Sequence, residues 1–280
     1  MDATLFLADL EAKPAALRGL ADVLAQANPW RVQVAVEPPV LMLGMGSSRF
    51  AASTVARRLR AHGLPTTAEY ASADPLPPSA ITTGAMISAQ APLKTVGISA
   101  SGATPETIDA MQRCVGRPAI AVTNHMESIR RAAEATEDLL ERRDTWLPTV
   151  AGILGEGPAT FAIAPAERLS SAEQSALMFR EGPRRSADAC ESGDWLHVDV
   201  YLTKPLDYRA LLFAGSRFDT QIMDWVGQRG STVVAVGGDV EGAVAAVRYV
   251  HDDDADVALL TEVLVAELVA ATWWNEGRTW

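Results

Sequence analysis

The chain has 280 residues, of which 48% are hydrophobic and 21% charged, so it can bury a full core, and its length predicts two domains. Its formal net charge of −11 argues against nucleic acid or a membrane surface as a partner, because both would repel it. The two cysteines, Cys114 and Cys190, are too few for a disulfide framework and have no metal-ligand spacing to the histidines. We therefore expect a protein of a reducing compartment with no metal site.

The first 27 residues predict an amphipathic helical arm. Leucines recur at largely helical intervals from Leu5 to Leu24, and Pro14 predicts a break or the first turn of a second helix. The segment has neither the basic start nor the small-residue cleavage pattern of a secretory signal. We expect no export and a cytoplasmic location.

Beyond the arm, the first half of the chain predicts strands alternating with helices. Residues 40–43 form a buried apolar run that leads into a glycine loop, and residues 47–61 have a helix-forming composition. A β-prone segment, a second buried strand, a helix and a third strand follow at residues 66–70, 95–98, 104–115 and 119–123. This alternation predicts a parallel sheet covered on both faces.

The second half repeats the pattern, with strands at 159–163, 210–213 and 232–236 and helices at 171–181 and 220–228. The apolar segment from Val257 to Trp274 is interrupted by Glu262 and Glu267, so it predicts a buried helix and not a membrane span. We predict an α/β fold of two flavodoxin-like or Rossmann-like three-layer units with parallel sheets. The first unit, with the N-terminal arm, is expected at residues 1–150 and the second at 151–280.

A serine-rich loop after the predicted strand 95–98 is the most informative segment. Ser99 and Ser101 supply hydroxyls, Gly102 lets the backbone approach a ligand closely, and Thr104 followed by Pro105 suits the start of a helix. Free amides and the positive end of the helix dipole at such a point favour a phosphate. The same pattern also fits an ordinary capped helix after a strand, so this loop by itself leaves both interpretations open.

A second loop, with Gly46, Ser47 and Ser48, also ends a buried strand and begins a helix. Ligands of parallel sheets collect beyond the carboxyl ends of the strands, so two hydroxyl-rich loops at one edge can share an anion. A dinucleotide fingerprint is the competing interpretation. This loop lacks the third glycine of that fingerprint, and no acidic residue except Glu69 follows it in a clear position. A sugar phosphate is therefore favoured over a nucleotide as the ligand.

In this order and spacing the two loops resemble those of the sugar-isomerase (SIS) domain family. The whole chain resembles its tandem members, such as the isomerase half of glucosamine-fructose-6-phosphate aminotransferase. The family's loops read glycine-threonine-serine and serine-glutamine-serine-glycine-glutamate-threonine, and the matching residues here are Gly46, Ser47, Ser48, Ser99, Ser101, Gly102 and Thr104. Alanine replaces the family's glutamine and glutamate, at Ala100 and Ala103. The resemblance implies that the matching residues hold the phosphate of a sugar.

The resemblance continues from Ala176 to His197 and implies that Glu181 is the isomerising base and His197 the ring-opening residue. Ser170 to Glu173 resembles a capping box, and Gly182 is expected to stop the helix, which places Glu181 in its last turn. A carboxylate there opposes the helix dipole, which suits a general base. A surface glutamate and a core histidine are the alternative interpretations of the two residues.

The chain also departs from the family pattern. The family's serine-threonine-lysine run has no counterpart from Asp144 to Thr149, and its C-terminal lysine has none from Gly277 to Trp280. We predict an aldose/ketose isomerase of a hexose or amino-hexose 6-phosphate that needs no metal or redox cofactor. The resemblance implies a homodimer. An amino-sugar phosphate deaminase or deglycase, and a non-catalytic sugar-phosphate sensor, are the alternatives.

Overall fold

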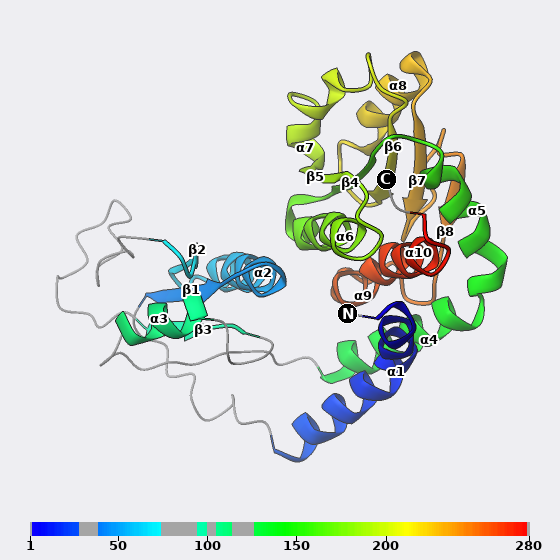
Figure 1. Ribbon diagram of the computed structural model, residues 1–280. Helices are drawn as coiled ribbons and strands as arrows, with labels where there is room; N and C mark the ends of the chain where they lie inside the picture. The colour runs from blue at the N-terminus through cyan, green and yellow to red at the C-terminus, as the bar shows by residue number, and fades with distance from the viewer. Residues whose placement is uncertain (1, 28–38, 74–93, 100–104, 114–125, 279–280) are drawn as a thin grey trace. The chain divides into compact units, whose positions relative to one another are not determined.

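The computed structural model describes residues 2–27, 39–73, 94–99, 105–113 and 126–278 (Figure 1). It is a mixed α/β structure with parallel sheets, which confirms the predicted class. The chain divides into two compact units, one of Met1–Ala27 with His125–Trp280 and the other of Asn28–Asn124. The expected division at residue 150 differs from this one, because the N-terminal arm and the helices after residue 125 pack with the C-terminal half.

The unit Asn28–Asn124 contains a three-stranded parallel sheet in the order β2-β1-β3. Its strands are β1 (Val40–Gly44), β2 (Thr66–Tyr70) and β3 (Lys94–Gly97), close to the three segments predicted. Helix α2 (Ser47–Ala61) packs against β1 and β2, and α3 (Pro105–Arg113) packs against β3. The strand predicted at 119–123 lies outside the described residues.

The other unit contains a five-stranded parallel sheet in the order β5-β4-β6-β7-β8. Its strands are β4 (Thr160–Ala164), β5 (Ala187–Glu191), β6 (Arg209–Phe213), β7 (Thr232–Val236) and β8 (Ala245–Val247). Taken in chain order they are arranged 2-1-3-4-5, as in flavodoxin-like sheets. The sequence predicted β4, β6 and β7 but not β5 and β8, which lie at the two edges.

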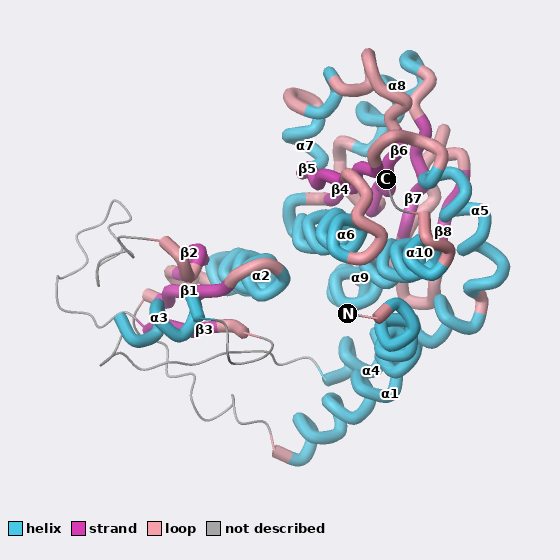
Figure 2. The backbone as a smooth tube through the Cα atoms, in the orientation of Figure 1, coloured by secondary structure: helices cyan, strands magenta, loops and turns pink. Residues whose placement is uncertain are grey.

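Helices of this unit cover the sheet, and two of them, α1 (Ala3–Gln26) and α4 (Met126–Glu141), pack on other helices of the unit (Figure 2). The others are α5 (Arg143–Gly155), α6 (Leu169–Glu181), α7 (Ser192–Trp195), α8 (Asp219–Arg229), α9 (Ala255–Thr261) and α10 (Val263–Asn275). Short 3₁₀ turns occupy Ala166–Arg168 and Asp199–Tyr201. Helix α1 continues through Pro14, so the break expected there is absent from the described arm.

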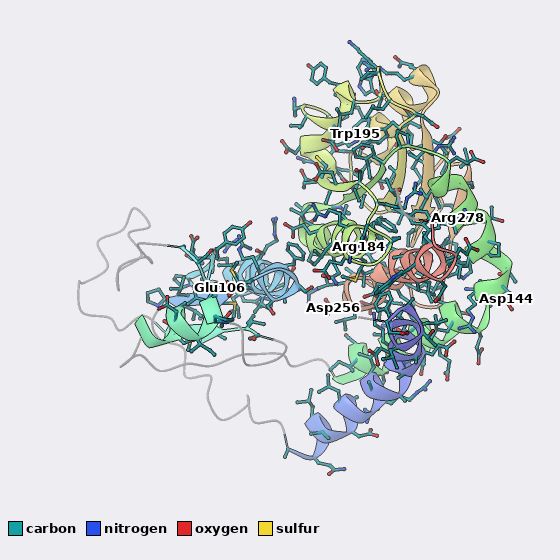
Figure 3. All side chains as sticks on the ribbon, in the orientation of Figure 1. Glu106, Asp144, Arg184, Trp195, Asp256 and Arg278 are labelled. Carbon is teal, nitrogen blue, oxygen red and sulfur yellow. The ribbon has the colours of Figure 1, made fainter. Side chains whose placement is uncertain are left out.

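Apolar side chains fill both faces of the five-stranded sheet. Successive residues of β4 point to opposite faces: Ala162 joins a core with Phe179 and Trp273, and Ile163 joins a core with Trp195. Trp195, labelled in Figure 3, and Trp273 are both fully buried. This two-sided core explains why the central strands are continuous apolar runs in the sequence.

Two glutamates interrupt the apolar C-terminal segment, and both are paired with a cation. The segment predicted as one helix forms two, which meet at the fully buried Glu262, and this carboxylate pairs with Arg168. Glu267 of α10 pairs with Lys13 of α1, which fixes the N-terminal helix to α10. Among the described helices, none is long and apolar enough to cross a membrane.

Candidate functional site

The loop that follows β1 is tightly constrained by its glycines. A Cβ on Gly44 would come within 2.7 Å of the Ser48 carbonyl carbon, so only glycine lets α2 begin this close to the strand. Gly46 has φ +50°, a conformation that favours glycine. Helix α2 begins at Ser47, and within the described residues no side chain caps its N-terminus. The result is a helix N-terminus with two serines in its first turn.

The second loop leaves the neighbouring strand at the same edge of the sheet. β3 pairs in parallel with β1, with Gly97 opposite Leu43, and the Ile98 amide donates to the Leu43 carbonyl at 2.8 Å. Ser99 therefore follows β3 beside the point where the chain leaves β1. Helix α3 begins at Pro105, as predicted.

The remaining residues predicted for this loop, Ser101, Gly102 and Thr104, lie outside the described residues. The structure thus brings the ends of β1 and β3 together and describes Gly46, Ser47, Ser48 and Ser99 of the seven predicted phosphate residues.

Glu181 and His197 lie in the other compact unit, and both are exposed. Glu181 is the last residue of α6, as predicted. The capping box expected from Ser170 is not formed, because α6 already begins at Leu169 with Arg168 at its N-cap. His197 follows α7, and its amide donates to the Asp194 carbonyl at 2.8 Å.

Strand β5 separates the two predicted catalytic residues along the chain. Glu181 precedes the amino end of β5 and His197 follows its carboxyl end, and β5 spans about 13 Å for its five residues. Within the described part of the chain, no hydrogen bond or ion pair joins the two side chains.

A basic residue that the sequence analysis did not single out lies at the first loop. The guanidinium carbon of Arg49 is 4.8 Å from the centre of the Tyr70 ring. Tyr70 ends β2 and is the register partner of Gly44, so parallel pairing brings it to the loop. The available sequence signal was that Arg49 directly follows Ser48.

The corresponding edge of the five-stranded sheet is occupied by the protein's own groups. After β6, the Asp219 carboxylate accepts hydrogen bonds from the amides of Gly215 and Ser216, at 2.8 and 3.1 Å. Burial raises the pKa of Asp219, and these two amides partly offset that rise. Arg168 donates to the carbonyl of Ala214 in the same loop. The amides of Gly215 and Ser216 are therefore already bonded and are not available to bind an anion.

Among the described residues near β5, the titratable groups form neither a reactive nucleophile nor a metal site. Cys190 is buried, and burial raises the pKa of its thiol to about 12, so little of it is the reactive thiolate. Burial also raises the pKa of Asp199. The described ranges contain no group of three or more His, Cys, Asp or Glu residues that could hold a metal ion.

Comparison with known proteins was made by sequence and by structure. No protein-family model and no curated protein matches the sequence. Among solved structures, the chain superposes on the C-terminal domain of glucosamine-fructose-6-phosphate aminotransferase from Francisella tularensis with a TM-score of 0.75 and 13% identity, covering 96% of both chains. It superposes on tagatose-6-phosphate ketose/aldose isomerase from Escherichia coli with a TM-score of 0.72 and 15% identity, covering 100% of this chain and 96% of the other.

The chain has the fold of the SIS-domain phosphosugar isomerases. A third SIS-fold neighbour is a protein described as glucosamine-6-phosphate deaminase from Thermotoga maritima, at a TM-score of 0.59 and 14% identity, covering 97% of this chain and 94% of the other. The resemblance inferred from the two loops is thereby confirmed for the fold. The SIS fold covers nearly the whole chain and so includes both sheets.

Proposed function

We propose that this protein is a phosphosugar isomerase that interconverts the aldose and ketose forms of a hexose or amino-hexose 6-phosphate. The proposal rests on the N-terminus of α2, which bears two serines, is capped by no side chain of the described residues, and lies at the edge of a parallel sheet beside the end of β3. Two structural neighbours are named for enzymes of glucosamine, fructose or tagatose 6-phosphates, which supports a ligand of this chemistry.

The phosphate is assigned to the loop edge of the three-stranded sheet. The Ser48 amide already donates to the Met45 carbonyl at 3.1 Å, and the Arg49 amide donates to the Gly46 carbonyl at 2.9 Å. In the proposal, the Ser47 amide and the positive end of the α2 dipole therefore stabilise the anion, even in a chain of net charge −11. In the proposal, the hydroxyls of Ser47, Ser48 and Ser99 add hydrogen bonds to the ester, and Ser101, Gly102 and Thr104 complete the cradle. The phosphate fixes the sugar but takes no part in the reaction.

The chemistry is assigned to Glu181 and His197. His197 would donate and accept the proton that opens the sugar ring. Glu181 would take a proton from C2 of the open aldose and return it to C1 through an enediol, which is general base catalysis and needs no metal. Both side chains are exposed, as groups that meet a substrate must be.

The proposal also includes the assembly. The chain would comprise two SIS units, one on each sheet, preceded by the α1 arm, and would act in the cytoplasm. Since β5 separates Glu181 from His197, a homodimer in which the histidine reaches the partner's substrate would bring the two groups to one sugar. Dimerisation would then be a condition for turnover.

A second candidate is supported by the likeness to the Thermotoga maritima protein that is described as a deaminase. An amino-sugar phosphate deaminase or deglycase would use the same base and the same phosphate cradle but release ammonia. A sugar-phosphate sensor would keep the cradle and lack turnover. Ala100 and Ala103, where the family has glutamine and glutamate, favour a site that has lost polar contacts.

One assay separates these functions. Purified protein is incubated with fructose 6-phosphate, tagatose 6-phosphate and glucosamine 6-phosphate, and sugar isomers and ammonia are measured. We expect isomerisation, and a loss of about 10²- to 10⁴-fold in the Glu181→Gln variant, the range of general base catalysis. Glu241→Gln, which changes another exposed glutamate of the same unit, is the control and should keep full activity. Ammonia release identifies a deaminase, and binding without turnover identifies a sensor.

A further inference from the structure

Arg49 is a cation without an anion. Its side chain makes no ion pair and no hydrogen bond among the described residues, and its buried Nε has no partner. The guanidinium lies instead over the face of the Tyr70 ring, with its carbon 4.8 Å from the ring centre. Arginines elsewhere in the described chain, such as Arg142 and Arg248, pair with carboxylates. Arg217 and Arg229 also contact aromatic rings and make no ion pair in the part of the chain that the structure describes, so the lack of a carboxylate partner alone does not set Arg49 apart. Arg49 differs in combining a buried Nε without a partner with a place in the first turn of α2, where an anion would match its charge.

The position of Arg49 in its helix is unfavourable without such a ligand. It is the third residue of α2, where the positive end of the dipole lies, and no acidic residue stands in this turn. A cation in a first turn destabilises a helix, whereas an anion stabilises it. An anion placed at the start of α2 would satisfy the helix and the guanidinium together.

Tyr70 positions the guanidinium at the loop edge. Because Tyr70 pairs in register with Gly44, its ring stands at the carboxyl end of β2, beside the strand that carries the loop. Stacking on an aromatic face restricts the planar guanidinium without using its hydrogen-bond donors. The N–H groups of the η nitrogens thus stay available to donate hydrogen bonds to the oxygens of an anion.

We propose that Arg49, positioned by Tyr70, is a binding residue that pairs with the phosphate ester and makes the site selective for phosphorylated over neutral sugars. This inference rests on the proposed function and adds to it a charged recognition element in a cradle otherwise made of hydroxyls and amides. Arginine binds phosphate through two parallel N–H donors, which hydroxyls cannot reproduce.

The test is calorimetric titration of the full chain with fructose 6-phosphate, inorganic phosphate and fructose. Arg49→Gln should weaken both phosphate-containing ligands by about 10- to 100-fold, the usual loss for a hydrogen bond to a charged group. Arg49→Lys should recover part of that loss. Arg57→Gln removes the same charge from an exposed position two turns further along α2 and should change affinity by less than about threefold.

The stacking partner is tested in the same way. Tyr70→Phe keeps the ring and should bind as the wild type does, whereas Tyr70→Leu removes the ring face and should weaken binding several-fold. Circular dichroism of every variant checks the fold, and since glutamine is a good helix former, Arg49→Gln should retain it.

The outcomes separate this inference from the proposed function. If the wild type binds fructose 6-phosphate and Arg49→Gln binds it equally well, Arg49 has no such role and the isomerase proposal stands. If Arg49 governs phosphate affinity but no sugar is turned over, the inference stands and the isomerase does not. If the wild type binds neither fructose 6-phosphate nor inorganic phosphate, both are refuted.

Discussion

Removing the guanidinium of Arg168 should sharply destabilise the unit that contains the five-stranded sheet. Arg168 Nη1 pairs with Glu262, whose side chain has no exposed surface, and Nη2 donates to the Ala214 carbonyl. Arg168→Met leaves a buried carboxylate and a carbonyl without their donor. Breaking a buried pair from one side costs about 3 to 5 kcal/mol in the free energy of unfolding, and we expect a loss in this range at pH 8.

The loss should depend on pH in a defined direction. Burial raises the pKa of Glu262 to about 7, despite the opposing effect of Arg168, and without Arg168 it should be higher still. Because this pKa lies above the unfolded value, the carboxyl favours folding most below about pH 4.5 and loses that contribution as pH rises through 7. In Arg168→Met the carboxyl takes up a proton more readily, so the difference from the wild type should shrink between pH 8 and pH 5.5.

Urea unfolding followed by tryptophan fluorescence measures these free energies, since Trp195 and Trp273 are buried in this unit. Arg168→Met/Glu262→Met replaces both charges with apolar side chains and should regain most of the lost stability. A loss below about 1 kcal/mol at pH 8, or a double variant no better than the single one, would show that the pair does not support the fold as argued.

Two further predictions concern local packing. Gly44→Ala should destabilise the three-stranded unit by about 1 to 3 kcal/mol and weaken phosphate binding, because its Cβ would meet the Ser48 backbone. In the control Gly19→Ala, the added Cβ would meet no atom within 4 Å, so we expect unchanged or increased stability. Hydrogen exchange and calorimetry measure the stability of both variants, and equal destabilisation by the two would contradict this reasoning. In a Cys114→Ser background, Cys190 should resist iodoacetamide at pH 8 until urea unfolds the protein, so rapid labelling of the native state would refute its burial.

The sequence predicts the parts of the fold whose strands are buried on both faces of a sheet. The central strands β1, β4, β6 and β7 are continuous apolar runs, and parallel sheets covered on both faces produce such runs. β5 was not predicted because Asp188 and Glu191 give this edge strand a polar pattern. β8 has three residues, too few for a periodic signal.

Other differences arise from contacts distant in sequence. The C-terminal apolar segment can bury Glu262 because its carboxylate meets Arg168, 94 residues away. The compact units differ from the predicted ranges because α1 packs on α4 and α10, which no local pattern encodes. For the candidate site, the strand-loop-helix signal located Ser47 and Ser48. The contact of Arg49 with Tyr70 depends on strand register and could not be read from the sequence.

The most direct test of the account is a crystal structure of the protein with fructose 6-phosphate. The ester phosphate should lie at the start of α2, about 2.7 to 3.2 Å from the Ser47 amide or from the hydroxyls of Ser47 and Ser48. A phosphate bound elsewhere on the molecule, or no phosphate bound at all, would contradict the central claim that this edge of the first sheet holds a phosphorylated sugar.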